Sequence, residues 1–134
     1  MGFARTPDPA RQIRGVGDFV QADWETLLAG SDAVIHCAAL AHVPWVDSPE
    51  ARERVWMQNV CLAEQVLSGA RKAGVRQFVY LSSAKVYGER SPENGFSEDS
   101  ALLPEDAYGF SKKMAEQRLQ RQAGELALLI LRLP

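Results

Sequence analysis

Residues 77–88 read Gln-Phe-Val-Tyr-Leu-Ser-Ser-Ala-Lys-Val-Tyr-Gly, and this stretch decides the fold class. Its first part, residues 77–82, is an apolar run of strand length that ends in hydroxyl side chains. Such a run is typical of a strand that is buried on both faces of a parallel sheet. Because parallel sheets bind ligands at the carboxyl ends of their strands, the serines stand where a site is expected.

Strand and helix patterns alternate on both sides of this stretch. The longest helix is expected to begin at Ser48 and Pro49, which suit an N-cap and a first turn, and to stop at Gly74. In chain order, we expect a strand at 13–19, a helix at 22–29, a strand at 33–38, a helix at 49–73, the strand at 77–82, a polar loop at 88–104, a helix at 105–122 and a strand at 126–133. This alternation predicts one α/β domain over residues 1–134 with a doubly wound parallel sheet, a Rossmann-like fold.

One part of such a fold is not found in the sequence. Doubly wound sheets bind the pyrophosphate of a dinucleotide at a Gly-rich turn after the first strand, and no such turn is found here. We therefore expect a partial sheet that lacks the first βαβ unit and starts near the end of the second strand. The strands at 13–19 and 33–38 would then be separated by an empty gap of two strands.

Composition and charge exclude several classes of function. The net charge is −2 with both signs interspersed, which argues against a nucleic-acid partner. No apolar run has membrane-spanning length and the N-terminus does not resemble a signal peptide, so we expect a cytoplasmic protein without a membrane partner. Cys37 and Cys61 form no metal or redox motif and are expected to be buried free thiols. His36 and His42 have no partners at ligand spacing, so no metal site is expected.

Tyr108 and Lys112 are four residues apart at the start of the helix expected at 105–122. This spacing places both side chains on one face of the helix, within reach of a shared ligand. A phenol has a pKa near 10, and a nearby ammonium group favours its phenolate form. The spacing alone also fits a surface Tyr lying over a Lys stem. Strand-end serines, a polar loop and Tyr-x-x-x-Lys at the start of a helix together predict one acid/base site.

Several stretches resemble the extended short-chain dehydrogenase/reductase family, also called NAD-dependent epimerases/dehydratases. They are Asp32-Ala33-Val34-Ile35-His36-Cys37-Ala38-Ala39, Asn59-Val60, the segment 82–88, Tyr108-Gly109-Phe110-Ser111-Lys112 with Ala115-Glu116, and Leu131-Arg132-Leu133-Pro134. The similarity is strongest to UDP-glucose 4-epimerases and to related nucleotide-sugar 4-epimerases and 4-ketoreductases of polysaccharide assembly. It implies that the chain is the middle portion of a longer enzyme, without the C-terminal substrate domain.

The resemblance assigns catalytic roles to three residues. Tyr108 would be the acid/base that takes a proton from a sugar hydroxyl as hydride leaves its carbon. Lys112 would bind the nicotinamide ribose and lower the pKa of Tyr108. Ser83 would hydrogen-bond the reacting oxygen.

The resemblance also implies how a dinucleotide is held. Besides Tyr108 and Lys112, the cofactor-binding residues would be Cys37, Ala38, Ala39 and Leu40 beside the dinucleotide, Asp18 and Phe19 at the adenine, and Asn59 behind the nicotinamide. Asn59 shares an apolar helix stripe and must find polar partners, so a satisfied core amide is the alternative. NAD is the cofactor expected for the family, although Arg5, if it follows the second strand, could tolerate the 2′-phosphate of NADP. Trp45 is expected in a loop that reaches the substrate pocket in relatives, so the resemblance implies a weak substrate contact for it.

Ala84 and Lys85 decide between the activities of the family. Dehydratases carry an Asp-Glu pair here, and without these carboxylates the elimination of water lacks its acid and base. We therefore reject a dehydratase and expect an NAD-dependent epimerase that acts at C4 of a nucleotide sugar, with a UDP-sugar as substrate. A 4-ketoreductase uses the same Ser, Tyr and Lys and stays open. An inactive truncated remnant or scaffold is the alternative from another class.

The two long helices predict how the complete enzyme assembles. Family members pair these helices into a four-helix bundle, so we expect a homodimer formed by residues 49–73 and 105–122. Each helix then needs one apolar face for the sheet and a second for the partner. Leu67 and Met114 are the candidates for the second face.

Overall fold

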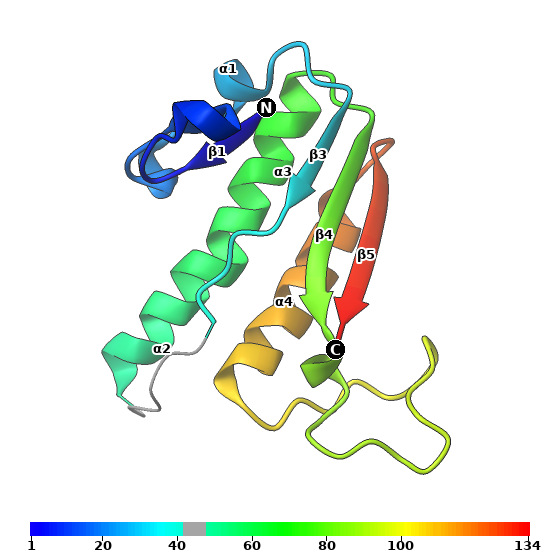
Figure 1. The fold of residues 1–134 in the computed structure, drawn as a ribbon. Coiled ribbons are helices and arrows are strands. Elements are labelled where there is room, and N and C mark those ends of the chain that lie inside the picture. Colours follow the sequence, from blue (N-terminus) through cyan, green and yellow to red (C-terminus); the bar gives the residue numbers. More distant parts are fainter. Residues whose placement is uncertain (42–47) are drawn as a thin grey trace.

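Two parallel sheets form the strand framework of the computed structural model. The larger sheet has the strand order β3 (Ala33–His36), β4 (Gln77–Ser83) and β5 (Ala127–Leu133). The smaller sheet pairs β1 (Gly2–Ala4) with β2 (Ile13–Gly15). Helices cover one face of the larger sheet (Figure 1). The expected α/β fold with parallel strands is confirmed.

The structure describes residues 1–41 and 48–134. His42 and Trp45 lie outside the described residues, so the expectations for these two side chains stay predictions. Among the helices within those ranges, none is long and apolar enough to cross a membrane.

The long helix that the sequence predicts is continuous but contains one wider turn. Ser48 caps it, and α2 (Pro49–Trp56) continues through a π turn at Met57–Cys61 into α3 (Leu62–Lys72). Gly74 follows with a φ of 75°, a left-handed conformation that glycine adopts without strain, so the helix ends where expected. The π turn was not predicted.

The remaining helices also begin at capping residues. Asp23 caps the short α1 (Trp24–Leu28), where its carboxylate accepts a hydrogen bond from the Thr26 amide. Asp106 caps α4 (Ala107–Gln122), the helix that starts next to the expected acid/base site. Both helices lie within the ranges predicted for them, because caps and apolar spacing are local signals.

The N-terminal strands differ from the prediction. The first strand is β1 rather than the segment 13–19, whose strand ends at Gly15. In the order of a doubly wound sheet, β2 and β1 take the third and second places and β3 the fourth, which leaves one place between them instead of two. An open cleft lies there, lined in part by Phe3, Trp24 and Val34.

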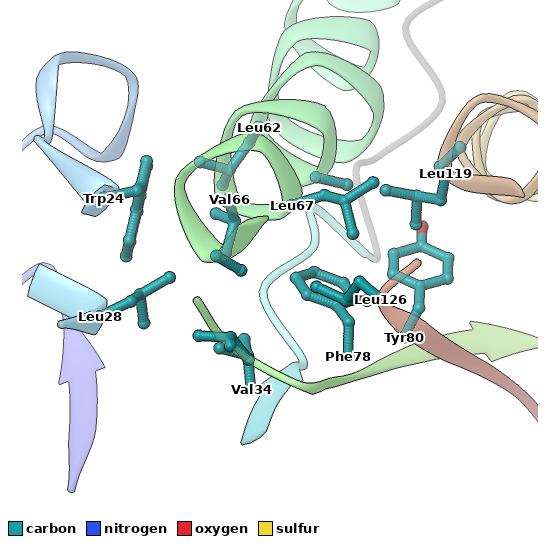
Figure 2. Packing of buried hydrophobic residues seen from close by; sticks show 14 of the residues in the cluster. Trp24, Leu28, Val34, Leu62, Val66, Leu67, Phe78, Tyr80, Leu119 and Leu126 are labelled. Carbon is teal, nitrogen blue, oxygen red and sulfur yellow. The ribbon is translucent and has the colours of Figure 1, made fainter. Parts of the chain in front are cut away.

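The core lies between α3 and its neighbours on two sides. Figure 2 shows Trp24 and Leu28 of α1 on one side of α3, with Phe78 and Tyr80 of β4 on another. Leu67 is completely buried in this cluster. The prediction that Leu67 forms an outer dimer face is therefore wrong, because α3 is packed against both α1 and the sheet.

The larger sheet is covered on one face only. Phe78 and Tyr80 are fully buried against the helices, whereas Val79 between them is half-buried. On that second face, Ile35 keeps 65% of its surface exposed and Leu129 keeps 44%. The expectation that β4 is buried on both faces is wrong for this chain, because no described element packs on the second face.

Candidate active site

The C-terminal ends of β3 and β4 and the start of α4 meet at one edge of the sheet. Lys112 joins two of these elements, since its ammonium group donates a hydrogen bond to the Leu81 carbonyl of β4 over 2.7 Å. The same nitrogen lies 5.8 Å from the ring centroid of Tyr108 and 4.6 Å from that of Tyr80. Lys112 thus connects the strand end to the Tyr108 ring.

Ser83 is the last residue of β4 and shapes the turn that follows it. Its hydroxyl accepts a hydrogen bond of 3.3 Å from the Lys85 amide, which caps a short 3-10 turn at Ala84–Val86. The carbonyl of Lys85 then faces α4 so closely that a Cβ on Gly109 would lie 2.6 Å from it. Glycine is therefore required between Tyr108 and Lys112, because it lets the helix start against this backbone. The sequence reasoning did not find this contact.

Burial governs the ionisation of both titratable residues. It lowers the pKa of Lys112 to about 8, although Glu116 and Cys37 act in the opposite direction. The pKa of Tyr108 is raised by burial and by the Asp106 carboxylate, with Lys85 opposing. Since the ammonium of Lys112 is directed to the Leu81 carbonyl, the lowering of the Tyr108 pKa by Lys112 stays a prediction for a site with bound dinucleotide.

Asn59 lies in the π turn and joins three elements. Its side-chain oxygen accepts a hydrogen bond of 2.6 Å from the Leu40 amide, and its amide group donates to the Leu40 carbonyl over 3.2 Å. The same group donates to the Ser111 hydroxyl of α4 over 2.9 Å. The expected polar partners of Asn59 are thus present, and they fix the segment after β3 beside the helix that carries Tyr108 and Lys112.

The segment after β3 offers small side chains to solvent. Cys37 and Ala39 are exposed, and Ala38 and Leu40 are half-buried. Cys37 is close enough to raise the pKa of Lys112. This surface, with little side-chain bulk beside a buried ammonium group, fits the nicotinamide half of a dinucleotide.

Cys37 and Cys61 are less buried than expected, whereas His36 is buried. Cys37 is exposed and Cys61 is half-buried, so the prediction of buried thiols is wrong. Cys37 extends past the end of β3, where no described element covers it. His36 is buried and stacks on the rings of Phe78 and Tyr80, and burial lowers its pKa to about 4.

The residues expected at the adenine lie in the N-terminal unit. The Asp18 carboxylate accepts a hydrogen bond of 3.0 Å from the Val20 amide. The Phe19 ring packs on Trp24, with 5.7 Å between centroids, and the guanidinium of Arg5 lies 5.9 Å from its centre. These residues share a neighbourhood at the ends of β1 and β2, apart from the Tyr108 and Lys112 pair.

A buried polar network that the sequence analysis missed joins β4, β5 and α4 next to the site. The Glu116 carboxylate accepts hydrogen bonds from the Ser82 hydroxyl and from the guanidinium of Arg132, whose nearest nitrogen is 2.8 Å away. Arg132 also donates to the Tyr87 hydroxyl over 2.6 Å. Sequence reasoning named Glu116 and Arg132 only within the stretches that carry the family resemblance. The signal that could have revealed the network is the position of Glu116, a charged residue four positions after Lys112.

A one-sided parallel α/β sheet whose β4 end is joined through Lys112 to the helix that carries Tyr-x-x-x-Lys defines a partial dinucleotide-binding domain of the extended short-chain dehydrogenase/reductase class. Residues 8–134 match the model of the NAD dependent epimerase/dehydratase family, and the chain belongs to this family.

Known relatives of the chain have more than one activity. The chain is 38% identical over 112 residues to a UDP-glucose 4-epimerase of Vibrio cholerae, covering 78% of this chain and 32% of that protein. It is 34% identical over 119 residues to a dTDP-glucose 4,6-dehydratase of Streptomyces griseus, covering 82% and 35%. The chain therefore spans about a third of the length of these curated relatives.

A solved structure supports the same relationship. A short-chain dehydrogenase/reductase superfamily protein from Agrobacterium tumefaciens with bound NAD superposes with a TM-score of 0.78 at 31% identity. The similarity covers 98% of this chain and 40% of that one.

Proposed function

We propose that this chain provides the acid/base centre and the nicotinamide-side wall of an NAD-dependent nucleotide-sugar 4-epimerase that acts on a UDP-sugar. The arrangement of Tyr108, Lys112 and Ser83 at one sheet edge carries the proposal. The family supports NAD as cofactor, and the NAD-bound relative supports it further. The UDP-glucose 4-epimerase relative supports the substrate class.

Each residue of the site has a distinct task in this proposal. NAD, when bound, accepts hydride from the sugar carbon and returns it. Tyr108 takes the proton of the sugar hydroxyl, and it returns a proton to the oxygen after the keto sugar has rotated in the site to present its other face. Ser83 holds the sugar oxygen. Lys112 binds the nicotinamide ribose and stabilises the Tyr108 phenolate by its charge.

Ala84 and Lys85 support an epimerase over a dehydratase, although relatives with both activities exist. Ala84 has no titratable group. The ammonium of Lys85 is held by Glu89 at 2.6 Å and by Asp106 at 2.9 Å, so it is tied to the start of α4. Neither side chain supplies the carboxylates that elimination of water requires. A 4-ketoreductase, which uses the same Ser83, Tyr108 and Lys112, is the second candidate.

The decisive experiment replaces Tyr108 by Phe in a complete enzyme assembled by joining this chain to the remaining units of a relative. We expect turnover of UDP-glucose to its 4-epimer to fall by about 10²–10⁴-fold, because an acid/base group is lost, while NAD affinity is retained. Tyr80→Phe is the matched control. It also removes one phenolic hydroxyl, and this hydroxyl has no hydrogen-bond partner among the described residues.

The result separates the candidate functions. Loss of turnover in Tyr108→Phe with a normal Tyr80→Phe supports the assignment. Turnover within a few-fold of wild type in Tyr108→Phe would contradict it. Release of a reduced sugar from a 4-keto substrate, without epimerisation, would favour the ketoreductase, and no reaction in the unaltered assembly would favour the inactive scaffold.

A further inference from the structure

Arg5 stands at the end of β1, next to the end of β2. The Ala4 carbonyl accepts a hydrogen bond of 2.8 Å from the Val16 amide, and the Arg5 carbonyl accepts one of 3.2 Å from the Gly17 amide. These two bonds bring Arg5 beside the segment that leads to Asp18 and Phe19. The residue therefore belongs to the carboxyl edge of the smaller sheet, the edge at which parallel sheets bind nucleotides.

The side chain of Arg5 is held in place but keeps unused donors. One guanidinium nitrogen donates to the Gln58 side-chain oxygen over 2.7 Å, and the group lies over the Phe19 ring. Arg5 is exposed, and no carboxylate pairs with it among the residues that the structure describes. Because a guanidinium has five N–H donors in a fixed fork, most of them remain available to an anion.

The position of Arg5 has a known meaning in dinucleotide-binding sheets. The side chain at the end of this strand meets the ribose 2′ position of the adenosine, where an acidic residue selects a free hydroxyl and an arginine accommodates a phosphate. The nearby Asp18 carboxylate is engaged by the Val20 amide. A guanidinium matches the oxygens of a phosphate with two parallel hydrogen bonds.

We propose that Arg5 binds the 2′-phosphate of an adenine nucleotide, so that this site accepts NADP alongside NAD. The proposal rests on the proposed dinucleotide function. It is based on the guanidinium of Arg5, which is held over the Phe19 ring and has no carboxylate partner among the described residues. This group lies at the strand end where dinucleotide-binding sheets contact the ribose 2′ position.

The test compares two adenine nucleotides on the 134-residue chain. Amide NMR titrations, which suit millimolar affinities, are made with adenosine 2′,5′-bisphosphate and with 5′-AMP. We expect the bisphosphate to bind at least about tenfold more tightly, since a charge-assisted hydrogen-bonded pair contributes on that order. Arg5→Leu should abolish the preference, and Arg5→Lys, which keeps the charge without the fork, should retain part of it.

Arg11→Leu is the matched control. Arg11 is an exposed arginine of the same N-terminal unit, 3.6 Å from the Asp8 carboxylate, and its loss should leave the preference unchanged. Equal binding of both nucleotides, or a preference that survives in Arg5→Leu, overturns the role of Arg5 and leaves the dinucleotide function standing. Failure of both nucleotides to shift any amide of the unaltered chain also overturns the role of Arg5, whereas the dinucleotide function is tested separately by turnover in the assembled enzyme.

Discussion

Lys112 brings its charge into a position that is almost closed to solvent. Only 2% of the residue is exposed, and burial lowers its pKa from the ordinary value of 10.5 to about 8. Glu116, four residues further along α4, acts against this effect. The site therefore holds a lysine whose charge state changes close to neutral pH.

This ionisation predicts a stability that rises with pH. Between about pH 8 and 10.5, the unfolded chain holds a proton on Lys112 that the folded chain has lost, so the free energy of unfolding should increase with pH. The slope approaches about 1.4 kcal/mol per pH unit for one proton. Urea unfolding between pH 7.5 and 9.5 measures it, below the range in which the raised pKa values of Tyr80 and Tyr108 act in the opposite direction.

Lys112→Met provides the comparison for this experiment. The variant should be more stable than the unaltered chain below pH 8, because it buries no charge, and it should lack the rise above pH 8. The same rise in Lys112→Met would show that another group is responsible.

Single residues differ in how much the sequence reveals about them. That Tyr108 and Lys112 lie near each other was predicted from their spacing, because a helix places residues four apart on one face, and their catalytic roles stay predictions. Asn59 is found as a polar residue in an apolar stripe, and its need for partners is met by Leu40 and Ser111. The close approach of Gly109 to Lys85 could not be found, since it depends on how a distant turn packs on the helix.

The Glu116–Arg132 pair acts at the scale of elements, because it joins β4, β5 and α4. Glu116 is 1% exposed as a side chain and Arg132 is 21% exposed. Arg132 also reaches Tyr87, whose ring stacks on Phe96 in the loop after β4, with 4.9 Å between centroids. The pair thus fixes this loop relative to the helix of the site.

Breaking this pair should cost much more than removing it. Glu116→Leu leaves the Arg132 charge without its partner and should lower the free energy of unfolding by about 3–5 kcal/mol. The double variant Glu116→Leu/Arg132→Met should lose less than the sum of the two single changes. Urea unfolding measures both. Asp32→Asn, at the exposed pair with Arg76, is the control and should change stability little. A Glu116→Leu variant as stable as this control would contradict the prediction.

The helices and the three apolar strands of the larger sheet were predicted from the sequence, whereas the short strand β1 and the one-sided cover of β4 were not. Ser48, Pro49 and Gly74 mark the long helix within the chain segment itself. β1 was missed because Gly-Phe-Ala has no alternation and becomes a strand only by pairing with β2. The one-sided burial of β4 was missed because an apolar run shows what a strand can bury and not what covers it.

At the scale of the molecule, the two separate sheets limit what the chain does alone. The edges of β1 and β3 border the cleft without a strand between them in the described structure, and the Gly-rich turn that anchors a pyrophosphate is not found in the sequence. We expect the 134-residue chain to bind NAD and NADP no better than millimolar and to turn over no sugar nucleotide. Calorimetric titration measures this, and micromolar affinity for either dinucleotide would contradict it.

The assembly of a complete enzyme is a further prediction. We expect a homodimer formed by α2, α3 and α4, with Leu67 excluded from its surface because it is buried within one chain. Phe110, which is half exposed near the start of α4, is a better candidate for that surface. Sedimentation of the complete enzyme gives the mass, and a strict monomer at micromolar concentration would contradict the prediction.

Because of the π turn at Met57–Cys61, the gene could lose one codon in this region without disturbing the rest of the long helix. A π turn holds one residue more than an α-helical turn, so deleting one residue here would close the wide turn into an ordinary one. α2 and α3 would both keep their orientation, and the residues of the turn itself would shift. Asn59 would then leave its partners on Leu40 and Ser111. In related proteins whose long helix is one residue shorter, the missing residue is therefore expected in this turn only if the protein no longer binds a dinucleotide.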